Sequence, residues 1–347
     1  MKKEKTLNKK EPWQLVWQLR GELKSSIRDY FHKNRYLEVD TPVGVICPGT
    51  EVHLDYFQTE WLDYTGKNHP LWLRSSPELH MKQVLAHGLP KIYQFAPCFR
   101  NGGELSEWHH PEFTMLEWYQ VGISFENFIT MTEELLRTSH ADLLRKFGSS
   151  VVQLEFPDMV QRFSLEQAFE EFAGIKLCDQ DPELAAKARA AGLHSPSIND
   201  DFETSFFKVL IEKIEPELAK FPAAVLYDYP ASQAALARVE DGRAKRFEYY
   251  FHGTELCNGF YELLGGNENR RRIRDANLQR RELRKPLTPE DDAFYSALDE
   301  GIPPCCGNAL GFERWLAVLL GVKSLDQVMP FRGQIPYVDS YFPGKEV

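Results

Sequence analysis

Long apolar segments are absent from the 347-residue sequence. It contains no run of about 18 apolar residues, which is the length that a membrane-spanning helix needs. The lysine-rich start, residues 1–10, has no apolar stretch behind it and so lacks the pattern of a secretory signal. We therefore expect a cytoplasmic protein that has no membrane partner.

Cysteines with metal-binding spacing are also lacking. The six cysteines are scattered, none forms a C-x-x-C pair, and adjacent Cys305 and Cys306 do not have the usual zinc spacing. The glycine-rich loops of Rossmann and P-loop nucleotide-binding folds do not occur either. We expect reduced, mostly packed thiols and a different way of binding any nucleotide.

Positive charge is not in excess. The formal net charge is −10, the opposite sign to that of proteins that bind phosphate backbones electrostatically. Extensive nucleic-acid contact is therefore not expected. Residues 270–285 are a local exception, because they concentrate arginine and lysine. This stretch is either a solvated helix face or a docking surface for an acidic macromolecule.

The periodicity of apolar residues predicts mixed helices and strands. Residues 21–34 have helical spacing and lead into a short strand that Pro42 closes. Residues 93–100 and 112–119 alternate like the strands of a long-looped hairpin, whose loop includes Gly102 and Gly103. A helix-rich middle follows, at roughly residues 124–220.

The remaining segments complete the predicted fold. Strands are expected at 223–228 and 247–264, a charged helix at 267–284, and a strand that leads into an apolar helix after 307. Long-looped hairpins mixed with separate helices indicate an α+β fold, with a mostly antiparallel sheet flanked by helices. We expect one domain over residues 1–347, of which residues 1–19 form a flexible N-terminal segment.

Charged and aromatic side chains share faces of the predicted hairpin. Period-two alternation puts Arg100 on one face of the first strand, and Phe113, Glu117 and Tyr119 on one face of the second. A guanidinium matches phosphate oxygens in a fork, an aromatic ring can stack on a base, and carboxylates accept hydrogen bonds from ammonium groups. The hairpin is therefore a candidate site for a phosphate, a base and an ammonium group.

Further carboxylates follow between residues 248 and 262. Alternation places Asn258, Phe260 and Glu262 on one face of a strand and Glu255 on the other. Glu255 can share a magnesium site with Glu248 only if the strand is bulged or bent between them. A salt-bridged structural role for either glutamate is the alternative.

The segment 307–314 predicts a strand that turns into a helix at Arg314. Glycines at 307 and 311 would let a nucleotide lie close to the backbone. The helix start and the guanidinium both favour anionic phosphate. A surface arginine beside a tight turn is the alternative interpretation.

Together, these segments resemble the three signature motifs of class II aminoacyl-tRNA synthetases, in the right order. Motif 1 resembles residues 36–42, motif 2 residues 98–101 through 109–117, and motif 3 residues 307–314. Within the class, the chain is similar to the lysyl branch in the phrases at 76–80, 111–117 and 255–263. The resemblance extends over about residues 20–335.

The resemblance implies a site for ATP and Mg²⁺. Its expected ATP-binding residues are Arg100, Asn101, His109, Phe113, Glu248, Glu255 and Arg314. Arg100 and Arg314 are the expected catalytic residues, which bind the α-phosphate and the outer phosphates. His109 is expected to bind the outer phosphates too, and Phe113 to stack on the adenine. Glu248 and Glu255 are the expected magnesium ligands.

The resemblance also implies a pocket for a lysine-like amino acid, whose ammonium groups meet acidic side chains. Its expected residues are Ser76, Glu78, Glu117, Tyr119, Asn258, Phe260, Glu262 and Ala309. Ser76 and Ala309 stand where tRNA-charging enzymes usually have alanine and glycine. Serine and alanine are usual there in the stand-alone relatives that attach (R)-β-lysine to a lysine of elongation factor P.

Those stand-alone relatives are the branch that the chain resembles, in length and in the phrases at 76–82, 115–119 and 229–233. Few residues precede the first predicted helix, so we expect no anticodon-binding domain and no stable tRNA binding. The implied activity is ATP-dependent activation of (R)-β-lysine as its adenylate, followed by transfer to elongation factor P. A homodimer is expected by resemblance, because motif 1 with its Pro42 forms the interface in this class.

Two alternatives stay open at this point. The activated amino acid could go to another acceptor, such as a tRNA-like molecule or a small amine, or the chain could be a catalytically silent regulatory paralogue. Motif 2 also departs from the family pattern, because Gly102 replaces the acidic residue two positions after Arg100. Either Glu104 or Glu107 takes over the contact to adenine, or ATP binds more weakly.

Overall fold

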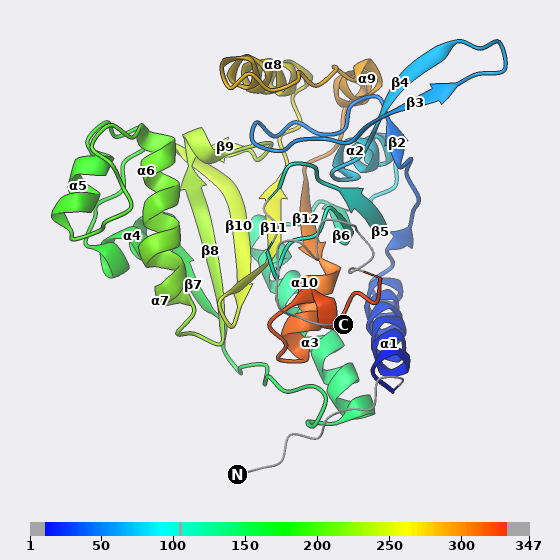
Figure 1. Cartoon of the computed structure of the whole chain (residues 1–347), viewed down its shortest axis with the longest axis horizontal. Coiled ribbons are helices and arrows are strands. Elements are labelled where there is room, and N and C mark those ends of the chain that lie inside the picture. Colours follow the sequence, from blue (N-terminus) through cyan, green and yellow to red (C-terminus); the bar gives the residue numbers. More distant parts are fainter. Residues whose placement is uncertain (1–10, 104–105, 332–347) are drawn as a thin grey trace, which may run out of the picture.

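A nine-stranded sheet forms the centre of the computed structural model, which describes residues 11–103 and 106–331 (Figure 1). Its strands are β1 (Leu37–Glu38), β5 (Lys91–Phe99), β6 (Glu112–Val121), β7 (Gln161–Ser164), β8 (Ala223–Pro230), β9 (Val239–Glu240), β10 (Arg243–Phe251), β11 (Thr254–Tyr261) and β12 (Cys305–Gly311). The strand order is β1-β5-β6-β12-β11-β10-β8-β7, and β9 pairs with β10. Only the outer pairs β1–β5 and β7–β8 are parallel. The predicted α+β fold with a mostly antiparallel sheet is confirmed.

The register of the sheet brings the distant motif segments side by side. β5 and β6 are the predicted long-looped hairpin, and β12 lies between β6 and β11. In this arrangement Ala309 lies opposite Glu117 on one side and opposite Asn258 on the other. Gly307 lies opposite Tyr119. Because side chains alternate along each strand, these positions present one shared face.

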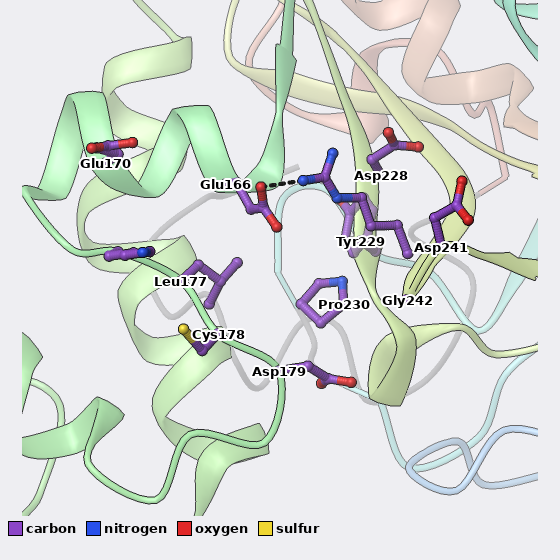
Figure 2. Close-up of a pocket in the computed structure, with 12 residues that line it drawn as sticks. Glu166, Glu170, Leu177, Cys178, Asp179, Asp228, Tyr229, Pro230, Asp241 and Gly242 are labelled. Atoms are coloured by element: carbon purple, nitrogen blue, oxygen red, sulfur yellow. Dashed lines mark hydrogen bonds and ion pairs between the residues drawn. The ribbon is translucent and has the colours of Figure 1, made fainter.

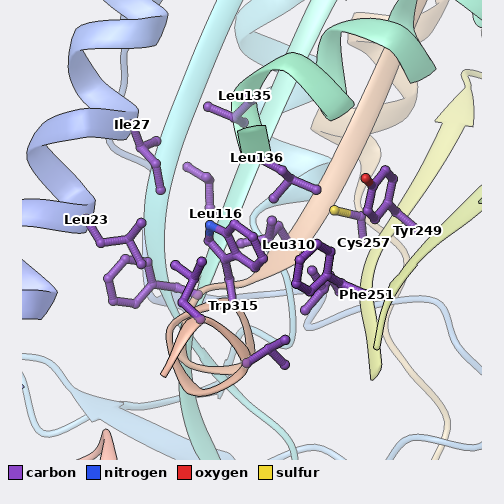
Figure 3. Packing of buried hydrophobic residues seen from close by; sticks show 14 of the residues in the cluster. Leu23, Ile27, Leu116, Leu135, Leu136, Tyr249, Phe251, Cys257, Leu310 and Trp315 are labelled. Atoms are coloured by element: carbon purple, nitrogen blue, oxygen red, sulfur yellow. The ribbon is translucent and has the colours of Figure 1, made fainter. Parts of the chain in front are cut away.

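The other face of the sheet carries the main hydrophobic core (Figure 3). Helices α1 (Glu11–Lys33), α3 (Phe125–Phe147) and α10 (Phe312–Leu319) contribute to this core. Trp118 and Trp315 are fully buried within it. Since Trp118 lies between Glu117 and Tyr119 in the sequence, the apolar core takes one face of β6 and the polar residues the opposite one.

The first helix is longer than the sequence predicted. α1 begins at Glu11, so the expected flexible segment at residues 1–19 is wrong for residues 11–19, while residues 1–10 lie outside the described part. Leu15 and Leu19 continue the four-residue spacing of Leu23 and Ile27, and they pack on the same core. Gly21 interrupts this pattern in the sequence but not in the structure.

The helix-rich middle of the chain packs at the β7–β8 end of the sheet. It contains α4 (Leu165–Ala173), α5 (Leu184–Ala190), α6 (Phe202–Val209) and α7 (Glu215–Leu218), with a π-helical turn at Leu210–Ile214. Their apolar side chains form a second core with β8 and β10. No helix in the described ranges is both long and apolar enough to span a membrane.

Smaller elements surround the polar face of the sheet. They are a second sheet of β2 (Gly44–Val45), β3 (Gln58–Leu62) and β4 (Asn68–Leu73), and the helices α2 (Glu78–Ala86), α8 (Gly266–Glu282) and α9 (Asp292–Glu300). The β3–β4 hairpin projects away from the rest of the chain (Figure 1). Apolar side chains of α2 and α9 pack in a third hydrophobic cluster.

The basic stretch at 270–285 is largely paired inside the chain. Ion pairs join Arg270 to Asp299, Arg271 and Arg272 to Glu268, and Arg274 to Glu290. Arg280 is buried, and its guanidinium donates to the carbonyl oxygens of Glu51, Val52 and Leu54. The positive charge of α8 is thus matched by neighbouring acids and carbonyls, which favours the interpretation as a helix face over a docking surface.

Candidate functional site

Two predicted phosphate ligands, Arg100 and Arg314, lie at one site. Arg314 Nη2 lies 2.9 Å from His109 Nε2, and Arg314 Nη1 lies 3.7 Å from Glu255 Oε2. Both arginines also lower the pKa of Glu255, which requires them to be near it. Arg100, His109, Glu255 and Arg314 are therefore brought together as predicted.

Arg100 has an unused hydrogen-bond donor inside this site. Its Cζ lies 5.2 Å from the centre of the Phe113 ring, so the predicted base-stacking ring and the predicted phosphate ligand are adjacent. Arg100 Nε is buried and has no hydrogen-bond partner among the described residues. A buried guanidinium donor without a partner is costly unless a ligand satisfies it. The arrangement fits an anionic group such as an ATP phosphate.

The structure describes part of the motif 2 loop, and the proposed contact of Glu104 or Glu107 to adenine stays a prediction. Glu104 lies outside the described residues, and the carbonyl oxygen of Glu107 accepts a hydrogen bond from the Leu325 amide. Asn101 is exposed, and its side chain accepts from the Gly102 amide. Gly102 has a φ of 59°, and a Cβ there would lie 2.8 Å from Asp55 Oδ2. A carboxylate of a different segment thus occupies the space beside the glycine that replaces the usual acid.

A β-bulge brings Glu255 to the same face as Glu248. Tyr249 lies opposite Cys257, whereas Tyr250 lies opposite Glu255, so the register shifts by one residue at Leu256. The bulge that a shared magnesium site of Glu248 and Glu255 requires is therefore present in the structure. Burial, followed by repulsion from Glu248, raises the pKa of Glu255 to about 7. Its side chain is still 39% exposed, so water moderates this repulsion.

This carboxylate pair has the chemistry of a magnesium site. Mg²⁺ in nucleotide sites is usually bound by one or two carboxylates, together with phosphate oxygens and water. Glu248 and Glu255 repel one another on a face that also carries the phosphate-ligand candidates. A cation between them would remove that repulsion. The described residues contain no cluster of three or more potential metal ligands, so phosphate oxygens would have to complete the coordination.

Glu248 is held in place by two side chains of its own strand. Arg246 Nη2 donates to its Oε1 at 2.6 Å, and the Tyr250 hydroxyl donates to its Oε2 at 2.7 Å. Arg246 also donates to Asn258 Oδ1 at 3.2 Å and lies 4.4 Å from the centre of the Tyr229 ring. Arg246 therefore links the metal-site candidate to the predicted amino-acid pocket.

Glu117 is one of two almost fully buried acids of the predicted amino-acid pocket. It is 1% exposed, and its two oxygens accept from Ser76 Oγ at 2.6 Å and from the Tyr119 hydroxyl at 2.9 Å. Burial and the nearby Glu78 carboxylate raise its pKa to about 8, although these two hydrogen bonds act in the opposite direction. Ser76 Oγ also accepts from the Glu78 amide at 3.0 Å, so one hydroxyl links both acids.

The third acid of the pocket, Glu262, follows β11 and is 1% exposed. Burial raises its pKa to about 7 even though the ammonium of Lys82 lowers it. Its Oε1 would lie only 2.3 Å from a Cβ at position 307, and the Tyr119 ring would lie 2.2 Å from that Cβ. Only glycine fits at position 307, because both neighbours lie against its backbone.

The remaining residues predicted for the pocket lie on strands β11 and β12. Phe260 lies opposite Gly307, and Asn258 lies opposite Ala309. Ala309 in turn lies beside Glu117. The eight residues predicted for the amino-acid pocket therefore come from the contiguous strands β6, β12 and β11, from the residue after β11, and from the start of α2 with the segment just before it.

Comparison with known proteins agrees with this geometry. A family model described as "tRNA synthetases class II (D, K and N)" matches residues 4–334. The chain belongs to the class II tRNA synthetase family. Similar curated proteins named elongation factor P (R)-β-lysine ligase occur in Hamiltonella defensa and Mannheimia succiniciproducens. Each is 37% identical, and the matched region covers 90% of this chain and 93% of the relative. A protein of the same name from Photobacterium profundum is 37% identical over 92% of this chain and 98% of its own length.

Two residues of this class II site were missed by the sequence reasoning. Lys82 and Arg246 each pair with predicted site acids. The i,i+4 spacing of Glu78 and Lys82 and the alternation of Arg246 with Glu248 were visible signals. Neither signal is specific, because such pairs are common on exposed surfaces.

A separate cavity of about 350 Å³ lies between α4 and the β8–β10 end of the sheet (Figure 2). Its lining includes Glu166, Asp179 and Asp228, and an Arg243–Glu166 ion pair crosses it. None of the residues predicted for the site appears among those that line it. The lining of a larger hollow of about 820 Å³ includes Arg246 but neither Glu248 nor Glu255.

The raised pKa of Glu117 predicts how stability depends on pH. Its ordinary value is 4.5 and its value in the folded chain is about 8, so between these the folded state binds a proton that the unfolded state does not. Stability should therefore fall as pH rises from about 5 to about 8, and Glu262 acts in the same direction. In Glu117→Gln, the fall in melting temperature across that range should be smaller than in the wild type.

Glu112→Gln is the matched control, because Glu112 lies on the same strand and is exposed. Its melting temperature should follow the wild-type pH profile. An unchanged slope in Glu117→Gln would mean that Glu117 does not hold the extra proton.

Proposed function

We propose that the chain is an ATP-dependent ligase that activates (R)-β-lysine as its adenylate and transfers it to a lysine side chain of elongation factor P. The observation that carries the proposal is the acidic pocket of Glu78 and the buried Glu117 and Glu262, which Asn258 and Arg246 connect to Glu248 of the nucleotide site. The names of the similar ligases support the same substrate and acceptor.

Activation needs positioning and charge neutralisation, and no general base. The amino-acid carboxylate is already an anion, and it attacks the α-phosphorus of ATP in line while the bond to pyrophosphate breaks. Negative charge moves onto the leaving pyrophosphate, and Arg100 and Arg314 are placed to absorb it. Glu248 and Glu255 would hold Mg²⁺, which supplies further neutralisation of the phosphates when bound.

The second half-reaction forms an amide. The neutral amine of the acceptor lysine attacks the carbonyl carbon of the adenylate, the amine loses a proton, and AMP leaves with the bonding electron pair. We expect the acceptor lysine to approach through the hollow that reaches Arg246, whose guanidinium donates to Glu248. A lysine side chain is long enough to enter such an opening without bringing the whole acceptor inside.

Ser76 supports the choice of a β-amino acid. Its hydroxyl donates to Glu117 and accepts from the Glu78 amide, so it sets the relative position of the two acids. An alanine at this position would lose both hydrogen bonds and leave Glu117 with only the hydrogen bond from the Tyr119 hydroxyl. A shifted ammonium needs a shifted carboxylate partner, because a misplaced buried charge is poorly tolerated.

The proposal treats the chain as one catalytic domain that works in the cytoplasm as a homodimer. Leu37, Val43 and Ile46 are large apolar residues that are exposed around motif 1, and Trp61 and Leu62 are exposed on the projecting hairpin. Exposed apolar residues that gather in this way are typical of protein interfaces. Light scattering should give twice the chain mass of 40.2 kDa; a monomer at micromolar concentration would contradict the dimer.

The direct test of function combines the chain with ATP, Mg²⁺, (R)-β-lysine and elongation factor P. Mass spectrometry should show one added β-lysyl group on a lysine of elongation factor P. Amino-acid-dependent exchange of pyrophosphate into ATP should occur with diamino acids and not with norleucine, which lacks the second ammonium. Exchange without modification would indicate another acceptor, and no exchange with any amino acid would indicate a silent paralogue.

Arg100→Ala and Arg314→Ala test the activation chemistry. Loss of one preorganised donor typically slows such a step by about 10²–10³-fold, so both variants should lose pyrophosphate exchange to that extent. Arg145→Ala is the control, because Arg145 is exposed at the far end of α3 and should retain full exchange. Retention of exchange within about tenfold of wild type in either site variant would contradict the assigned roles.

A further inference from the structure

Lys82 is a fully buried lysine inside the predicted amino-acid pocket. It lies on α2, one turn after Glu78, so both side chains share a face of the helix. Its Nζ lies 2.6 Å from Glu78 Oε1 and 2.6 Å from Glu262 Oε2. Lys82 therefore bridges two acids that the family resemblance assigns to the substrate.

Burial of this ammonium is possible only because of these two partners. An unpaired buried charge costs several kcal/mol, and a group without partners usually becomes neutral instead. Burial alone would lower the pKa of Lys82, but Glu262 and Glu78 outweigh it and hold the pKa above its ordinary value. Lys82 is therefore a permanent positive charge of the pocket.

The pocket has more negatively charged side chains than positively charged ones. Glu78, Glu117 and Glu262 face one another closely enough for each carboxylate to be affected by another. When all three carboxylates are ionised, which the ammonium groups of a bound substrate favour, they and the Lys82 ammonium give a net charge of minus two. The two positive charges of a diamino acid match this deficit, while its carboxylate faces Arg100 on the nucleotide side.

We propose that Lys82 is a specificity-determining positioning residue, which fixes the place of Glu78 and Glu262 and sets the pocket charge to that of a substrate with two ammonium groups. This inference rests on the proposed function. By engaging one oxygen of each acid, Lys82 leaves the other oxygens for the substrate. A lysine that merely fastened α2 to the sheet would hold the same contacts without influence on substrate choice.

Paired substitutions separate these two roles. Glu262→Gln lowers the pocket charge to minus one, so it should weaken use of a diamino acid. Adding Lys82→Met restores minus two. The double variant should therefore have a kcat/KM for (R)-β-lysine in pyrophosphate exchange at least about tenfold above that of Glu262→Gln. The KM for ATP should stay within about twofold of wild type in both, because the nucleotide side is unchanged.

Thermal unfolding provides the second readout. Lys82→Met alone leaves both acids without their cation, so its melting temperature should fall clearly below that of the wild type. The double variant should recover part of that loss, because one of the unpaired carboxylates is gone. Lys220→Met is the control: it removes a lysine from an exposed Lys220–Glu217 pair and should alter neither exchange nor melting temperature measurably.

Two results would contradict the proposed role of Lys82. A double variant that activates (R)-β-lysine no better than Glu262→Gln, or that melts no higher than Lys82→Met, would overturn the role of Lys82. Wild-type exchange with (R)-β-lysine is the separate test of the proposed function. If the wild type is active and the double variant is not rescued, only the Lys82 inference fails.

Discussion

Unbalanced negative charge buried on one face of a sheet is the constraint around which this chain is built. Glu117 and Glu262 are almost fully buried, and burial pushes the pKa of each upward. Such a site lowers the stability of the empty fold, and proteins retain it where a ligand supplies the missing charge. The site is therefore incomplete without positively charged groups from outside the chain.

Packing on the apolar face of the same strands holds these buried acids in place. Trp118 and Trp315 lie in a continuous core of α1, α3 and α10 behind the acids. Because neighbouring residues of β6 point to opposite faces, a rigid core also fixes the acids in front of it. Hydrogen bonds from Ser76 and Tyr119 then orient Glu117, so little reorganisation is needed when a substrate arrives.

Alternation alone predicted which of these side chains share a face of a strand, and the family resemblance supplied their roles. Periodicity placed Glu117 and Tyr119 on one face of a hairpin, and the register of the structure agrees. The predicted start of α1 at residue 21 is too late, because the apolar spacing continues through Leu15 and Leu19. Family resemblance supplied the order of the motifs, which spacing alone does not give.

Other features depend on tertiary contacts that a sequence does not display. The i,i+4 relation of Glu78 and Lys82 is visible in the sequence, but the burial of that pair depends on Glu262, which is distant in the chain. Asp55 lies beside Gly102 although about fifty residues separate them. Contacts of this kind, between residues that are far apart in the sequence, form only when the chain folds.

The one-residue bulge at Leu256 has an evolutionary consequence. Leu256 and Cys257 both reach the apolar core, and Glu255 returns to the catalytic face only because of the extra residue between the paired positions. Loss of the codon for Leu256 would leave a regular strand in which Glu255 still lies opposite Tyr250, on the face of Glu248. At this point β11 could therefore lose a residue and keep the carboxylate pair, at the cost of the packing of Leu256 in the core.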